Sequence, residues 1–153
     1  MQVVPFAFEK KTDAVSDALL AVFESVEAYQ DPLHLVLLAH KGLSALKAQT
    51  ISKWLQLQPN QMADLLGITP KTFRHYQQED KVFDATKSEQ LLKLAQVAEL
   101  GKEVFGDANS FNRWLQKPAY GLAGKLPIEL FYTGGGIDLV TDELTRIAYG
   151  DLA

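Results

Sequence analysis

The chain has 153 residues, of which 47% are apolar and 22% charged, enough apolar material for a core in one domain or two very small ones. It has no cysteine, which excludes a disulfide framework and a thiolate metal site. No apolar run approaches the roughly 20 residues that span a bilayer, and the first residues lack the order of a signal peptide. We therefore expect a soluble, cytoplasmic protein without contact to a membrane.

The net charge of −4 argues against indiscriminate nucleic-acid binding, but the charge is unevenly distributed. Residues 41–93 carry eight basic and five acidic side chains, whereas acidic side chains are in excess in residues 1–40 and 94–153. Chance and a local attraction to phosphate explain this basic segment equally well.

Helical periodicity dominates the chain, and no alternating run is long enough to predict a sheet. A first helix is predicted over residues 14–29, with Asp13 as its cap and a single apolar stripe. The stripe consists of Val15, Leu19, Val22, Phe23 and Val26. Asp31 and Pro32 restart the chain as a cap and a first turn. The segment 33–41, which ends at Gly42, is short and rich in leucine and valine, so a buried strand is an open alternative to a helix.

Four further helices are predicted downstream. Residues 44–55 form an amphipathic pattern. Thr86 and Glu89 have the spacing of a capping box that opens a long helix to Phe105. Ser110 can cap a short helix through Gln116, and a last helix is expected over residues 137–149.

The segment 61–76, QMADLLGITPKTFRHY, has the spacing of a helix-turn-helix. Ala63 is small where the two helices would touch, and Gly67 tolerates the positive φ of the turn. Thr69 would cap the second helix and Pro70 would start it. An ordinary corner in a helical bundle is the alternative, but the agreement of several positions favours DNA reading.

The polar side chains of this second helix, over about residues 70–77, are the candidate DNA contacts. They are Thr69, Lys71, Thr72, Arg74, His75 and Gln77. One departure from the template is Gln58, which stands before Pro59 where a Ser, Thr, Asp or Asn cap is usual.

Other motifs point to structure rather than to chemistry. The glycine cluster in YTGGGID, residues 132–138, could hold phosphate, but we interpret it as a turn between two helices, because no strand precedes it. Asp142 and Glu143 are expected on a solvated helix face. The histidines His34 and His40 share no metal-ligand spacing, and no Ser/His/Asp arrangement is credible. We predict no enzyme, no catalytic residue, no metal and no cofactor.

Two long segments resemble a known family. WLQKPAYGLAGKLPIEL (114–130) and GGGIDLVTDELTRIAYG (134–150) resemble the toxin-binding domain of the Xre/MbcA/ParS antitoxins. LGITPKTF, SEQLLKLAQVAEL and EVFGD, between residues 66 and 107, are similar to their Xre-type DNA-binding half. The resemblance covers about residues 42–153 in one order and spacing.

This resemblance implies an all-α fold with a helix-turn-helix domain (43–107) and a small C-terminal toxin-binding domain (108–153). The first 40 residues are not diagnostic of the family, and we expect residues 1–42 to form an N-terminal helical segment that can dimerise. It also implies a cognate toxin, of the RES type that consumes NAD or of a related ADP-ribosylating type. The C-terminal domain would block the toxin's active site, and the helix-turn-helix would repress the shared operon. The alternative is a stand-alone transcription regulator whose C-terminal domain dimerises or binds a ligand.

The toxin contacts are expected at the end of the chain, because a short tail beside a rigid helix can enter a cleft at low ordering cost. The candidates are Arg146, Tyr149, Gly150, Asp151, Leu152 and Ala153. A homodimer is expected too, because two-fold operators need two recognition helices. We favour the apolar stripe of residues 14–29 as the dimer contact, with folding back onto the same chain as the alternative.

Overall fold

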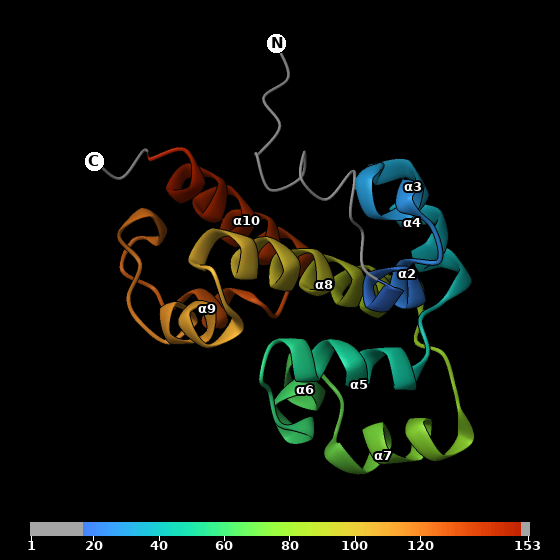
Figure 1. Cartoon of the computed structure of the whole chain (residues 1–153). Helices are drawn as coiled ribbons and strands as arrows, with labels where there is room; N and C mark the ends of the chain where they lie inside the picture. Colours follow the sequence, from blue (N-terminus) through green and yellow to red (C-terminus); the bar gives the residue numbers. More distant parts are fainter. Residues whose placement is uncertain (1–16, 151–153) are drawn as a thin grey trace.

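The computed structural model describes residues 17–150, and every regular element in that range is a helix. Strand-like pairing within it is limited to one isolated bridge between Ser44 and Val82. Figure 1 shows the long helix α8 (Ala85–Phe105) at the centre, with the other helices around it. None of the described helices is long and apolar enough to cross a membrane. The predicted all-α fold is confirmed; Asp13, Val15 and residues 151–153 lie outside the described range.

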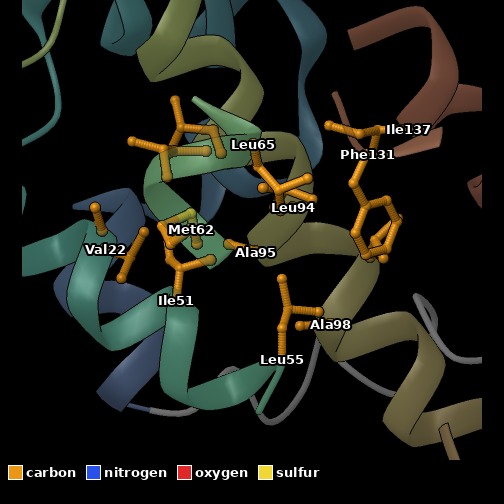
Figure 2. Close-up of a cluster of buried hydrophobic side chains, with 14 of the residues drawn as sticks. Val22, Ile51, Leu55, Met62, Leu65, Leu94, Ala95, Ala98, Phe131 and Ile137 are labelled. Carbon is orange, nitrogen blue, oxygen red and sulfur yellow. The ribbon is translucent and has the colours of Figure 1, made fainter. Parts of the chain in front are cut away.

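Helix α8 is the scaffold of the fold. Its cap is Asp84, whose Oδ1 accepts a hydrogen bond from the Lys87 N–H at 2.9 Å, so the predicted capping box of Thr86 and Glu89 is wrong. The helix ends at Gly106 with a φ of +89°, as predicted. It is buried on several sides because α2, α4, α5, α9 and α10 all pack against it. Figure 2 shows α8 side chains between those of α5, α6 and the segment that leads into α10.

The N-terminal segment folds back onto the same chain. It is not one helix over residues 14–29: α2 (Asp17–Phe23) and α3 (Val26–Gln30) are separated at Glu24, which has a φ of +67°. The Ser25 side chain caps α3 by accepting from the Ala28 N–H at 3.1 Å. The stripe residues Leu19, Val22 and Phe23 are at most 1% exposed in the single chain. The prediction that this stripe forms the dimer contact is therefore wrong.

The next two helices follow the sequence prediction closely. Helix α4 (Pro32–Lys41) has Asp31 as its cap and ends at Gly42, which rules out the alternative of a strand. Helix α5 (Ala45–Trp54) is capped by Ser44. In both helices a polar cap stands next to a short run of helix-forming residues, so local chemistry alone determines the start.

The C-terminal part is built from short helices. Helix α9 (Ala108–Leu115) is capped by Asp107, which accepts from the Ser110 N–H at 2.6 Å; the predicted cap at Ser110 is wrong. Two 3-10 turns follow, η1 (Tyr120–Leu122) and η2 (Pro127–Leu130), and then α10 (Gly134–Ala148). Gly101 of α8 leaves room for the ring of Phe111, which packs directly against the helix backbone.

The glycine cluster is the first turn of α10, and not the loop before it. Thr133 caps this helix by accepting from the Gly136 N–H at 3.0 Å. A Cβ at Gly136 would collide with the Leu130 carbonyl oxygen. The cluster therefore lets a helix begin in close contact with the preceding turn, and our interpretation of it as an interhelical turn was wrong.

Candidate functional site

The helix-turn-helix consists of α6 (Pro59–Leu65) and α7 (Pro70–Glu79). Ala63 is fully buried where the helices meet, and Gly67 has the predicted positive φ of +72°. The inner face of α7 is held by aromatic rings: Phe73 and Tyr76 stack on Phe83, with centroid distances of 6.2 and 5.0 Å. Their packing directs the opposite face of α7 to solvent, at the lower edge of Figure 1.

The two helices differ in how their first turns are capped. Thr69 caps α7, as predicted, by accepting from the Thr72 N–H at 3.1 Å, and the two hydroxyls are 3.0 Å apart. Gln58 makes no capping hydrogen bond with its side chain at the start of α6. Gln61 Oε1 accepts from the Gln58 N–H at 2.8 Å, which is the reciprocal contact of a capping box and satisfies a different backbone donor.

The six predicted DNA contacts lie on or next to α7, in two different environments. Lys71, Arg74 and His75 are exposed, whereas Thr72 and Gln77 are half-buried. Arg74 and Gln77 line a shallow hollow that also involves α5 and the start of α6. Thr69 is exposed at the start of the helix, where its hydroxyl already serves as the cap.

The predicted toxin contacts lie at the opposite end of the fold, on the last turns of α10 (Figure 1). The side chain of Arg146 is 44% exposed and Tyr149 is 42% exposed. Gly150 follows with a φ of +76°, and the predicted contacts Asp151, Leu152 and Ala153 lie beyond the described residues.

Glu143 contradicts our prediction of a solvated face, although its neighbour Asp142 is exposed as predicted. Glu143 is only 1% exposed. Its Oε1 accepts from Arg146 Nε at 2.9 Å and from Arg146 Nη2 at 2.7 Å. Its carboxylate also lies against Gly121, where a Cβ would collide with it. One signal was available in the sequence, since Glu143 follows Val140 by three residues and borders the apolar stripe of α10.

Polar side chains join the helix-turn-helix to the C-terminal helices, and the sequence did not reveal them. The buried Gln90 of α8 donates from Nε2 to the carbonyl oxygens of Leu65 at 2.8 Å and Phe131 at 2.9 Å. The Tyr132 hydroxyl donates to Asp64 Oδ2 at 2.6 Å, and this hydrogen bond raises the pKa of Tyr132. The two candidate surfaces therefore belong to one hydrogen-bonded framework.

Metal-ligand geometry gives no candidate site within residues 17–150, where no three His, Asp or Glu side chains could hold a metal ion together. His34 Nδ1 is 2.7 Å from Asp31 Oδ2. That contact, together with the Leu33 N–H, lowers the pKa of the Asp31 carboxyl.

Residues 17–150 combine a helix-turn-helix, formed by α6 and α7, with a second group of helices that ends in α10. This is the organisation of a helix-turn-helix protein that carries an additional helical domain. Residues 34–96 match the antitoxin Xre-like helix-turn-helix domain, and residues 100–150 match the antitoxin Xre/MbcA/ParS C-terminal toxin-binding domain. The chain belongs to the Xre/MbcA/ParS antitoxin family. These matches also confirm the helix-turn-helix interpretation over the alternative of a bundle corner.

A curated relative is the protein named Antitoxin Xre of Pseudomonas putida. The chain is 29% identical to it over 80 residues, which are 52% of this chain and 50% of that protein. The match therefore spans about half the length of this relative.

Proposed function

We propose that this protein is the antitoxin of a type II toxin–antitoxin system, acting in the cytoplasm as a binding protein and not as an enzyme. One observation carries the proposal: a helix-turn-helix domain and a toxin-binding domain of antitoxins follow each other in the same chain. Each has a surface of its own, at opposite ends of the fold (Figure 1). One end binds the operator and the other binds the toxin.

The toxin of this proposal is of the RES type that consumes NAD, or of a related ADP-ribosylating type, and the C-terminal domain covers its active site. The exposure of Arg146 and Tyr149 on the last turn of α10 supports this. Side chains on the last turn of α10 can contact the rim of a cleft while residues 150–153 enter it.

Repression of the shared operon is assigned to α7. Arg74 and Lys71 reach bases or phosphates, Thr69 and Thr72 contact phosphates, and His75 and Gln77 complete the surface. The exposure of Lys71, Arg74 and His75 supports this assignment. Phosphate contacts of this kind make binding depend on salt.

The homodimer remains part of the proposal, with a different contact. Helix α4 buries Leu35, Leu38 and Ala39 and exposes a second apolar stripe: Leu33 at 62%, Val36 at 38% and Leu37 at 56%. Antiparallel pairing of two α4 helices would join these stripes. It would also bring Asp31, at the start of α4, close to the basic end of α4 in the second copy, where His40 and Lys41 lie. A two-fold contact of this kind is self-complementary in shape and charge.

Co-expression with the product of the adjacent reading frame tests the proposal. We expect the full chain to co-purify with it, to protect cells from it and to shift the operator fragment in a gel titration. Replacing Arg74 by Ala should weaken operator binding by about 1–3 kcal/mol at fixed salt if Arg74 pairs with a base, while the toxin still co-purifies. A chain that binds the operator but neither binds nor inhibits that product would favour the stand-alone regulator instead.

A further inference from the structure

A tight loop of residues 117–125, called the basic loop below, lies beside α10. The Ala119 N–H donates to the Lys125 carbonyl oxygen at 3.0 Å, and the Gly124 N–H donates to the Ala119 carbonyl oxygen at 3.0 Å. The chain reverses at Ala123 and Gly124, which have φ values of +57° and +78°. The loop therefore has a defined shape that its own backbone hydrogen bonds maintain.

The basic loop is fixed against α10 by the contact between Gly121 and Glu143. Because a Cβ at position 121 would collide with the Glu143 carboxylate, the loop backbone approaches α10 as closely as only glycine allows. Arg146 donates two hydrogen bonds, of 2.7 and 2.9 Å, to Oε1 of the same carboxylate. The Glu143 carboxylate thus joins the loop and the guanidinium in one unit. Figure 1 shows the backbone of the loop as the orange turn beside the last turns of α10.

The chemistry of this unit is that of a protein-binding surface. Tyr120, next to Gly121, is 93% exposed, the highest value among the exposed large apolar side chains of residues 17–150. Lys117 and Lys125, at the two ends of the loop, are exposed as well. Tyrosine and arginine are enriched among the residues that dominate protein interfaces, because they bury a large apolar area and still make polar contacts. On α10, the exposed carboxylate closest in sequence to Arg146 is that of Asp142, one turn earlier.

We infer that the basic loop is a second toxin contact, separate from the C-terminal tail, in which Tyr120 enters a pocket of the toxin that is bordered by carboxylates. This inference rests on the proposed function. Operator DNA is the other anionic partner, and two observations disfavour it. The loop lies far from α7 (Figure 1), and residues 94–153 carry eight acidic and five basic side chains, which repel phosphate overall.

Affinity measurements with the full chain and the toxin encoded beside it test this inference. The variants are Tyr120→Ala and the double variant Lys117→Glu with Lys125→Glu. Val82→Ala is the matched control for an exposed apolar side chain, because Val82 is 54% exposed and follows α7. Lys71→Glu is the control for charge reversal on the DNA-binding side. Circular dichroism establishes that each variant is folded. Operator binding is measured separately, and only Lys71→Glu is expected to weaken it.

We expect Tyr120→Ala to raise the Kd for the toxin at least 30-fold, the size of an interface hot spot. The double lysine variant should associate more slowly, and its association rate should lose the salt dependence of the wild type. Both variants should bind the operator as the wild type does, and Val82→Ala and Lys71→Glu should bind the toxin normally.

The possible failures are distinguishable. If the wild-type chain does not bind the toxin, the proposed function fails and the inference fails with it. If the wild type binds and Tyr120→Ala binds within about two-fold of it, the inference alone is overturned. If the double lysine variant loses operator binding and keeps toxin binding, the basic loop contacts DNA instead.

Discussion

The buried carboxamide of Gln90 allows a quantitative test of how the two halves of the protein are held together. Its Nε2 donates to the carbonyl oxygens of Leu65, in the last turn of α6, and of Phe131, after η2. We consider Gln90→Leu, which keeps a side chain of similar size but removes both donors. Each buried carbonyl left without a donor costs roughly 1–3 kcal/mol.

The apolar surface that leucine adds offsets part of this loss, by about 1 kcal/mol. We therefore expect Gln90→Leu to lower the free energy of unfolding by about 1–5 kcal/mol, with about 3 kcal/mol as the middle of this range. A loss of about 3 kcal/mol is a large part of the roughly 5–15 kcal/mol typical of small proteins. Urea denaturation followed by circular dichroism measures it, with the slope checked for two-state behaviour.

Gln96 of the same helix is the matched control. It is partly buried and donates to a single carbonyl oxygen, that of Tyr29, at 2.8 Å, so Gln96→Leu should cost about 1 kcal/mol. The reasoning is refuted if the two variants are equally stable, or if Gln90→Leu lies within about 0.5 kcal/mol of the wild type, as an ordinary surface substitution does.

Three further predictions concern the proposed contacts and acid stability. Deleting residues 150–153 should weaken protection from the toxin in a growth assay while circular dichroism stays unchanged; full protection would remove the tail from the inhibitory contact. Leu37→Glu should give a folded monomer by light scattering, whereas Phe23→Glu should unfold the chain because Phe23 is fully buried; a dimeric Leu37→Glu would exclude α4 as the contact. Asp84 and Asp107 have pKa values lowered chiefly by the backbone N–H groups of Lys87 and Ser110, respectively. The stability that these two carboxylates contribute is therefore present above the unfolded-state pKa of about 3.9 and is lost as the pH falls below it. In an acid titration, the double variant Asp84→Asn, Asp107→Asn should lose stability less steeply with falling pH than the wild type. An unchanged pH dependence of stability would contradict this.

Residues adjacent in the sequence determined several elements of this structure, although two of the predicted caps were wrong. Helices α4 and α5 and the turn at Gly67 follow the predictions because each depends on adjacent residues: a polar cap, a proline in the first turn, or a positive φ. The caps at Thr86 and Ser110 were wrong because an aspartate stands shortly before each, at Asp84 and Asp107. Several polar residues close together can each cap a helix, and the direction in which the chain enters decides which one does.

Some residues of the candidate surfaces could likewise be placed from the sequence, and others could not. Thr69, Lys71 and Arg74 could be placed from the helix-turn-helix spacing, because the inward packing of Phe73 and Tyr76 fixes which face of α7 remains exposed. Glu143 could not be placed, because the glycine that covers it is 22 residues earlier in the chain. Tyr120 gave no signal either, since the exposure of a side chain depends on what packs beside it.

The sequence by itself determined that the chain is helical, where its helix-turn-helix lies and to which family it belongs, since these are properties of spacing along the chain. Only the tertiary structure decided what each apolar face packs against. Periodicity shows that Leu19, Val22 and Phe23 share one side of a helix and must be buried. Whether α8 or a second copy buries them depends on the positive φ at Glu24 and on contacts between residues far apart in the chain. For the same reason, the sequence of α4 does not distinguish its exposed apolar stripe from its buried one, because packing by other helices decides which of the two is covered.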